Sequence, residues 1–341
     1  MSEIVAEYID RLCSVEMRPQ GNLPRGVTHR LYEAARLAQG GKPLTYLAGH
    51  ALLDRVRKGD YVFIVTGTGA PPGLPKGETD GPLGGAALAR AVDLGLGAKP
   101  VIISEERLAG PIAAAVQAGG ISLLDREAVA ARSHAGVLEL FPVGIHEGQL
   151  AAARLLDQYE PTAIIFIEKA GPNHKGVFHS ILGYARGPDI MGSAYWLADQ
   201  ARASGVLTIG VGDGGNEIGF GKIRDAVREI QPHGQNCRCP CEGGVATVTT
   251  CDVLVAASVS NWGAYGIGAY LGYLLEDPDL VQDEDTERRM LESCVLAGCT
   301  DSILGAQVPA VDGIPLGVNL ALVRMLRAIV GIALKVVHRG F

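Results

Sequence analysis

Residues 60–82 read DYVFIVTGTGAPPGLPKGETDGP, a short β-branched run followed by a loop rich in glycine and proline. Five further short apolar runs follow it, at 100–104 (PVIIS), 121–124 (ISLL), 162–167 (TAIIFI), 206–211 (VLTIGV) and 253–257 (VLVAA). Stretches of helical character separate the runs and close the chain, at 82–95, 105–118, 146–158, 192–204, 217–230, 263–275, 284–297 and 317–337. Short apolar strands alternating with helices predict a doubly wound α/β fold, with a mainly parallel sheet covered by helices on both faces.

The first 58 residues have a different pattern, because they are helical in character. Residues 18–24 (RPQGNLP) break this segment, since proline and glycine are unfavourable inside helices. We therefore expect two parts: an N-terminal helical segment, 1–58, packed on a main α/β domain, 59–341. Within that domain, residues 231–243 (QPHGQNCRCPCEG) are expected to form an excursion over the surface.

Composition and charge exclude several classes of partner. The 341 residues carry a net charge of −7 without any long Lys/Arg block, so nucleic-acid binding is not expected. The seven cysteines are an odd number, which favours reduced thiols and a cytoplasmic location over a disulfide framework. The charged N-terminal stretch does not have the pattern of a signal peptide. A homo-oligomer is left open.

Residues 253–275 carry no formal charge and are long enough to span a bilayer. A polar Ser-Asn step at 260–261 divides this stretch, so a buried strand, a turn and a buried helix explain it better. The last helical stretch carries three basic residues (Arg324, Arg327 and Lys335) and is expected to pack on the domain as an amphipathic helix. No membrane partner is therefore expected.

Polar loops rich in glycine follow four of the apolar runs, at 67–82, 168–173, 212–217 and 258–263. Ligands of open α/β sheets bind at the carboxyl ends of the strands, so these loops should converge on one small-molecule site. Glycine in such loops lets the backbone approach a ligand closely. The candidate substrate-binding residues are Gly67, Thr68, Gly69, Lys76, Glu78, Thr79, Asp80, Asn173, Gly214, Gly215, Asn216, Glu217 and Asn261.

Some of these features have structural explanations that stay open. An internal ion pair is the alternative for Glu168 and Lys169, since charged residues are seldom buried unless paired. Asp80 has a second role available, as the cap of the following helix. His179 is equally explained as a core histidine or as a site residue. Residues 210–215 (GVGDGG) match the GxGxxG pattern, but the Asp within them disfavours a pyrophosphate, so dinucleotide binding is not favoured.

Two groups of residues raise the question of a metal ion. Cys237, Cys239 and Cys241 alternate along the surface excursion, which is a tighter spacing than most zinc sites use. Reduced thiols are favoured there, and zinc binding with His233 and Cys251 is the alternative. We assign no metal ligand and expect no obligatory cofactor, but Mg²⁺ or another divalent cation on carboxylates stays open. The acids concerned are Asp80, Glu168, Asp213 and Glu217.

Several motifs in this chain occur together in one family. They are GETDGP at 77–82, IEKAG at 167–171 with Asn173, GVGDGGNEIGFGK at 210–222, VSNWGAYG at 259–266 and DGIP at 312–315. With these motifs the chain resembles the D-glutamate cyclase family, more narrowly its C-terminal catalytic-type domain in stand-alone form. The resemblance covers roughly residues 55–335, and the CRCPC stretch at 237–241 departs from it.

The resemblance implies a carbon–oxygen lyase that reversibly converts D-glutamate, a small acidic substrate, to 5-oxo-D-proline and water. The α-amine must lose a proton and the γ-carboxylate must gain one, so a general base and a general acid are needed. We expect Glu168 or Asp213 to be the base, and Lys169 to stabilise or protonate the γ-carboxyl group. Backbone N–H groups at 67–69 and 214–215 would bind substrate oxygens. The α-carboxylate and amine would be held by Asn173, Asn216 and Asn261.

Two other functions are compatible with the same loops. One is a metal-dependent hydrolase or lyase that acts on another small amide or carboxylate. The other is a non-catalytic sensor that binds a small acid or a nucleotide. Ligand-induced stabilisation by NAD or ATP, and none by members of the glutamate series, would overturn the cyclase interpretation.

Overall fold

The computed structural model describes residues 2–19 and 24–336, and its centre is a seven-stranded sheet in which all neighbouring strands are parallel. In spatial order the strands are β3 (Ser122–Leu123), β4 (Ala135–Leu140), β2 (Lys99–Ser104), β1 (Tyr61–Thr66), β5 (Ala163–Ile167), β8 (Leu207–Gly212) and β9 (Val253–Ala256). The predicted doubly wound α/β fold is confirmed. Two small antiparallel pairs lie outside this sheet, β6 (Phe178–His179) with β7 (Ala185–Arg186) and β10 (Ala310–Val311) with β11 (Ile314–Pro315).

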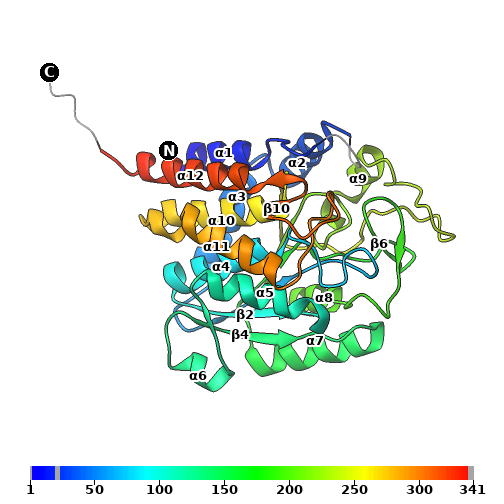
Figure 1. Ribbon diagram of the computed structural model, residues 1–341, viewed down its shortest axis with the longest axis horizontal. Coiled ribbons are helices and arrows are strands. Elements are labelled where there is room, and N and C mark those ends of the chain that lie inside the picture. Colours follow the sequence, from blue (N-terminus) through cyan, green and yellow to red (C-terminus); the bar gives the residue numbers. More distant parts are fainter. Residues whose placement is uncertain (1, 20–23, 337–341) are drawn as a thin grey trace.

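Helices cover both faces of the sheet because side chains along each buried strand alternate between two hydrophobic cores. On β1, Phe63 and Val65 belong to the core beneath α6 (Arg126–Ala130), α7 (Ile145–Tyr159) and α8 (Tyr195–Ala203). Val62 and Ile64 belong to the larger core on the opposite face. Figure 1 shows α6 and α7 on one side of β2 and β4 and a thicker stack of helices on the other.

The helices on the thicker side are stacked several layers deep. The helices that build it are α3 (Leu44–Arg55), α4 (Pro82–Leu96), α5 (Glu106–Ala118), α10 (Ser260–Leu274), α11 (Glu284–Leu296), α1 (Ser2–Cys13) and α12 (Leu316–Ala333). Near β9 lie α2 (Val27–Ala38), α9 (Arg224–Ile230) and the 3-10 turn η1 (Gly221–Ile223), while a second turn, η2 (Pro278–Leu280), packs on α10. Within α10, Trp262, Tyr265 and Tyr270 are among the largest fully buried side chains, so this helix forms the middle of the stack.

The N-terminal helices α1–α3 share the larger core with the sheet and with α10. The buried carboxylate of Asp10 joins them, because it accepts hydrogen bonds from the Tyr32 hydroxyl (2.9 Å) and from the backbone N–H of Leu44 (2.5 Å) and Thr45 (3.1 Å). The turn that leaves α1 therefore has a fixed position over the main sheet. This turn carries Arg18, a residue of the candidate site.

By length and composition α12 is apolar enough to cross a membrane, with a mean hydropathy of 1.7. A buried core helix passes the same test, and one side of α12 contributes Leu322, Val323 and Leu326 to the larger core. The helix packs against α1, α10 and α11, as expected for the amphipathic packing helix at 317–337, of which residue 337 lies outside the described residues.

Two of the differences from the sequence-based expectations concern a strand of the main sheet and the start of a helix. Strand β4 was not predicted, because its apolar run is short. Its last two residues, Glu139 and Leu140, are also not fully buried. The helix expected from 217 begins only at Arg224, after the turn η1. Residues 217–220 instead pack flat on β8, where a side chain at Gly210 would come within 2.4 Å of the Ile218 carbonyl oxygen. The strand, turn and helix expected for 253–275 are confirmed as β9 and α10.

The strand order alone predicts where on the sheet a small ligand binds. From β1 the chain proceeds toward β2, β4 and β3 on one side, and later continues through β5, β8 and β9 on the other. The loops that leave the adjacent strands β1 and β5 therefore diverge, which opens a crevice at this topological switch point.

Candidate active site

A cavity of about 170 Å³ lies at the switch point, between loops that follow β1, β5 and β8. Pockets for drug-sized ligands have volumes of roughly 300–1,000 Å³, so this cavity suits a smaller metabolite. The predicted site residues that line it are Thr68, Gly69, Glu78, Asp80, Glu168, Asp213, Asn216 and Glu217. It is also lined by Arg18, Leu74, Ala170, His179, Ser180, Ile181, Leu182, Arg186, Met191, Ser302, Ile303 and Asp312.

Three carboxyl groups from three strand ends face one another in this cavity. One oxygen of each of Asp80, Glu168 and Asp213 lies within 4.8 Å of the other two. Burial, together with neighbouring acids, raises the pKa of Asp80 to about 7 and raises the pKa of Glu168 and Asp213 well above their ordinary values. A carboxyl group with a pKa of about 7, as for Asp80, can accept and release protons near neutral pH, as general acid–base catalysis requires.

Glu168 is held in place by its backbone and by two hydroxyl groups. It has a left-handed backbone with φ of 50°, and its carbonyl accepts a hydrogen bond from the Thr68 hydroxyl at 2.5 Å. Its Oε2 atom accepts a second from the Ser260 hydroxyl at 2.5 Å. Gly81 allows the close approach of the β1 loop, because a Cβ atom there would lie 3.0 Å from the Cβ atom of Glu168.

Arg18 supplies positive charge to this acidic cluster. Its guanidinium donates hydrogen bonds to Asp213 and to the Ser258 carbonyl, and it lies 3.1 Å from Asp312. Burial opposes the charge, but Asp213 and Asp312 raise the pKa of Arg18 further above its ordinary value, so it stays charged. Arg18 was not among the residues predicted from the sequence, because it lies in the break at 18–24, far in sequence from every strand-end loop.

Asp80 and Asn261 cap each other's helices. The Asp80 carboxylate accepts the backbone N–H of Ser260 (2.9 Å) and Asn261 (2.8 Å), at the start of α10. The Asn261 side chain accepts the N–H of Gly81 (2.9 Å) and Gly84 (2.7 Å), at the start of α4. Asp80 therefore caps α10, and not α4, the following helix that the sequence analysis expected it to cap. Asn261 does not line the cavity, so its predicted role in holding substrate is not supported.

The glycines after β8 do not offer free donors to a ligand. The N–H groups of Asp213 (3.1 Å) and Gly214 (2.7 Å) bind Oε1 of Glu217, and that of Gly215 (2.6 Å) binds its Oε2. The predicted use of Gly214 and Gly215 as oxyanion donors is therefore wrong. No helix of the described residues starts directly after this loop, so the GxGxxG match does not form a dinucleotide site.

Lys169 points away from the cavity, into the protein. It forms an ion pair with Glu105 at 2.5 Å and donates to the Gly67 carbonyl at 2.9 Å, and both charged side chains are almost fully buried. Glu105 also accepts the N–H of Gly192 at 2.8 Å. The structural alternative given above is thus correct for Lys169, and the role predicted for it as an acid or electrophile is not supported. The partner, however, is Glu105 and not the adjacent Glu168.

Four other predicted residues also lie outside the cavity lining. Thr79 accepts a hydrogen bond from the Asn261 amide through its carbonyl, and Lys76 reaches the carbonyl of Ala297 at 3.4 Å. Asn173 donates to the Gly244 carbonyl at 2.7 Å and thereby holds the surface excursion. Gly67 accepts the hydrogen bond from Lys169. These residues position the loops and do not face the ligand.

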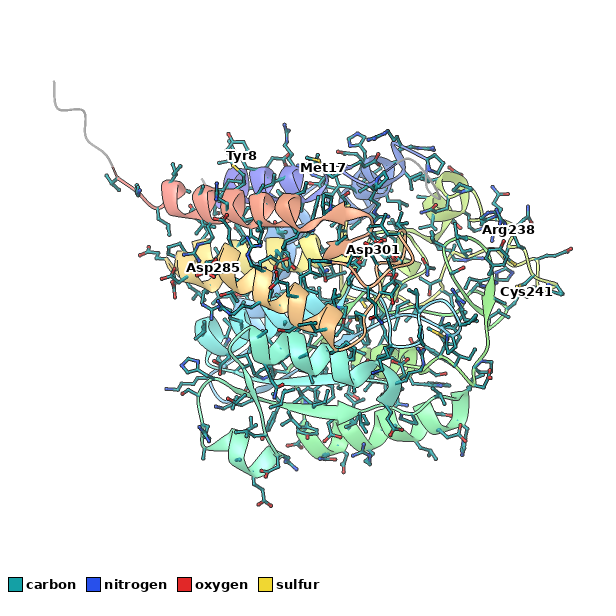
Figure 2. The ribbon with its side chains drawn as sticks, in the orientation of Figure 1. Tyr8, Met17, Arg238, Cys241, Asp285 and Asp301 are labelled. Atoms are coloured by element: carbon teal, nitrogen blue, oxygen red, sulfur yellow. The ribbon has the colours of Figure 1, made fainter. Side chains whose placement is uncertain are left out.

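Two segments that the strand-end rule did not predict complete the cavity. The β6–β7 hairpin contributes Arg186 and Ser180, and the Ser180 hydroxyl is buried without a hydrogen-bond partner in the described residues. The segment after α11 contributes Asp312, which a buried Asp301 positions by accepting the N–H of Gly313 at 2.8 Å. Figure 2 labels Asp301 beside the turns that precede α12.

The fold and cavity define a doubly wound α/β protein with an acidic small-molecule site at its switch point. The family model for "D-glutamate cyclase-like, C-terminal" matches residues 13–327, and the chain belongs to that family. It is 30% identical over 214 residues to the human protein "D-glutamate cyclase, mitochondrial", which covers 59% of this chain. The matched part is 30% of that relative's own length.

Proposed function

We propose that this chain is a carbon–oxygen lyase that interconverts D-glutamate and 5-oxo-D-proline plus water. The observation that carries the proposal is the Asp80–Glu168–Asp213 cluster, whose three carboxyl oxygens lie within 4.8 Å in a metabolite-sized cavity. Membership of the D-glutamate cyclase-like family supports this substrate class.

The charges that line the cavity match the groups of glutamate. Carboxylates outnumber arginines there, so the substrate ammonium has several acidic partners. Arg18 and Arg186 offer positive charge to the two substrate carboxylates. The Arg18 Nε atom and the Ser180 hydroxyl are both buried without partners in the described residues, so each has a hydrogen bond to give.

Ring closure forms a bond between the α-nitrogen and the carbon of the γ-carboxyl group, and it breaks a carbon–oxygen bond at that carboxyl carbon. Two protons leave the ammonium, and both end on the departing oxygen, which leaves as water. The carboxyl groups of Asp80, Glu168 and Asp213 accept and deliver these protons: burial raises the pKa of all three, and the pKa of Asp80, about 7, keeps its protonated and ionised forms together near neutral pH. Arg18 stabilises the negative charge on the tetrahedral intermediate.

The test of this function is incubation of the purified chain with D-glutamate, L-glutamate or 5-oxo-D-proline, followed by chiral chromatography. We expect interconversion of D-glutamate and 5-oxo-D-proline, and no reaction of L-glutamate. An inert D-series together with turnover of another amide or carboxylate would support the metal-dependent hydrolase or lyase instead.

A divalent cation on the same three carboxylates is the second candidate, because their spacing also suits an oxygen-liganded ion. We expect turnover not to require Mg²⁺ or Mn²⁺, since the Arg18 guanidinium already binds Asp213 and Asp312. The measurement is the rate before and after chelation, with Mg²⁺, Mn²⁺ and Zn²⁺ added back separately. Loss of activity that Mg²⁺ or Mn²⁺ restores, and Zn²⁺ does not, would contradict this expectation.

The pH dependence of the reaction should respond to Arg18. The charge of Arg18 lowers the pKa of both Asp80 and Asp213, so its removal raises them further. Because a base must be ionised to act, the acidic limb of the kcat/KM profile should move to higher pH in Arg18→Gln, by about one unit or more. The matched control is Arg154→Gln, an exposed arginine on α7, whose profile should be unchanged. An acidic limb that stays in place in Arg18→Gln would show that these carboxyl groups do not set the profile.

A further inference from the structure

The cysteine-rich surface excursion has no part in the chemistry proposed above. It extends from the end of α9 and lies beside the β6–β7 hairpin, and Figure 2 labels Arg238 and Cys241 at its outer edge. Arg238 donates its backbone N–H to the Gly183 carbonyl at 2.8 Å, between the two strands of that hairpin. The excursion and the hairpin are therefore in direct contact.

Four potential metal ligands meet at this contact. They are His179 on β6 and the three cysteines of the excursion, Cys237, Cys239 and Cys241, and their ligand atoms all lie within 4.8 Å of one another. All three cysteines are free thiols. The Nε2 atom of His179 lies 3.3 Å from Sγ of Cys239 and 3.6 Å from Sγ of Cys241. Sγ of Cys237 lies 3.4 Å from each of the other two sulfur atoms.

These distances are close to the edges of a zinc tetrahedron. With Zn–S of about 2.3 Å and Zn–N of about 2.0 Å, the ligand atoms of a tetrahedral site lie about 3.5–3.8 Å apart. The separations of 3.3–3.6 Å differ from those edges by a few tenths of an ångström. A small outward movement of the four side chains is enough to admit the ion.

The atoms around the four ligands are arranged as metal sites require. The Nδ1 atom of His179 lies 3.1 Å from the Val177 carbonyl, so donation to that oxygen leaves Nε2 free as a ligand. Sγ of Cys241 is approached by the Gly243 N–H at 3.4 Å and by the Asn173 amide at 3.6 Å. Both donors favour a thiolate, which is the form of cysteine that binds zinc.

We propose that His179, Cys237, Cys239 and Cys241 bind a zinc ion that joins the surface excursion to the β6–β7 hairpin. Four protein ligands leave no open position for water or substrate, so the site is structural and not catalytic. His179 also accepts a hydrogen bond through its carbonyl from Asn216, at 3.1 Å, and both residues line the cavity. Zinc therefore fixes one wall of the cavity, and the proposal does not depend on which reaction takes place there.

The two other ligands considered from the sequence are not part of the cluster. Cys251 is buried in the core beneath α8, and the His233 ring packs against Gly183, where an added Cβ atom would lie 3.0 Å from its Cγ atom. His179 was missed as a ligand because it precedes the cysteines by more than fifty residues. His233 and Cys251 are therefore matched control positions.

The test is metal analysis of the full chain, purified under reducing conditions and reconstituted with zinc. We expect about one zinc ion per chain, and loss of that ion in Cys239→Ser and in His179→Ala. His233→Ala and Cys251→Ala should retain it. Substitution with Co²⁺ should give the intense d–d bands of a tetrahedral site and thiolate-to-cobalt charge transfer, with a charge-transfer intensity that corresponds to three thiolates.

The cobalt spectrum of the unmodified chain decides the question even if a cysteine variant does not fold. Octahedral cobalt bands, or no cobalt binding under reducing conditions, would overturn the proposal. So would zinc that persists in Cys239→Ser, or zinc that is lost from His233→Ala and retained by His179→Ala. None of these measurements uses enzymatic activity, so a failure of the zinc site and a failure of the proposed function give different results.

Discussion

Replacement of Glu168 by Gln should lower the turnover number by at least about 100-fold, the lower end of what a general acid or base contributes. Gln has nearly the same shape and still accepts the hydrogen bond that Ser260 donates to Oε2, but it cannot bind a proton. The loss should therefore appear in kcat more than in KM. Steady-state kinetics with D-glutamate and with 5-oxo-D-proline measure both directions.

Stability separates a chemical role for Glu168 from a structural one. Burial and the neighbouring acids raise the pKa of Glu168, so a neutral side chain at this position is favoured and should not destabilise the fold. The matched control is Glu229→Gln, an exposed glutamate on α9, which should retain full turnover. A decrease of less than about tenfold in Glu168→Gln would remove this residue from the chemistry.

Replacement of Lys169 by Met should lower the free energy of unfolding by about 3–5 kcal/mol, the usual cost of removing one partner from a buried ion pair. The side chains of Lys169 and Glu105 are 1% and 2% exposed, so Glu105 would be left charged, buried and without its cation. Denaturant unfolding at pH 7 measures the effect.

A double variant distinguishes the ion pair from simple packing. In Lys169→Met with Glu105→Gln the buried charge is gone, while Gln keeps an oxygen for the Gly192 N–H. We expect most of the lost stability to return. If Lys169→Met were as stable as the unmodified chain but as inactive as Glu168→Gln, Lys169 would act in the chemistry after all.

The sequence was sufficient to predict the fold and eight of the twenty residues that line the cavity. Buried parallel strands are continuous apolar runs, and the residues directly after such runs lie at one edge of the sheet. Glu168, Asp213 and Asp80 were found in this way. The apolar run is less clear in β4, because the carboxyl end of this strand is not fully buried. For that reason β4 was missed.

The errors in the site arise from the direction of side chains and from tertiary contacts. Lys169 follows Glu168 directly, but the left-handed backbone of Glu168 lies beyond the end of β5, so strand alternation does not predict where the two side chains go. No local pattern indicates that Glu217 binds the N–H groups of Gly214 and Gly215.

Arg18 and Asp312 could not be assigned from local patterns, because each comes from a segment far from the strand ends in sequence. Arg18 reaches the cavity because the Asp10 hydrogen bonds hold α1 against the neighbouring helices. Asp312 reaches it through the turn that Asp301 supports. A carboxylate cluster without a cation was the remaining signal, since buried acids need a positive partner.

The central claim is that the carboxyl groups at the switch point catalyse loss of water from the γ-carboxyl group of D-glutamate, and addition of water to the ring carbonyl of 5-oxo-D-proline. Incubation of 5-oxo-D-proline with the purified chain in ¹⁸O-labelled water, followed by mass spectrometry, tests it most directly. We predict D-glutamate with the label in its γ-carboxylate, formed at least about 100-fold more slowly by Glu168→Gln. No labelled glutamate above the uncatalysed background, or equal labelling by Glu168→Gln, would contradict the account.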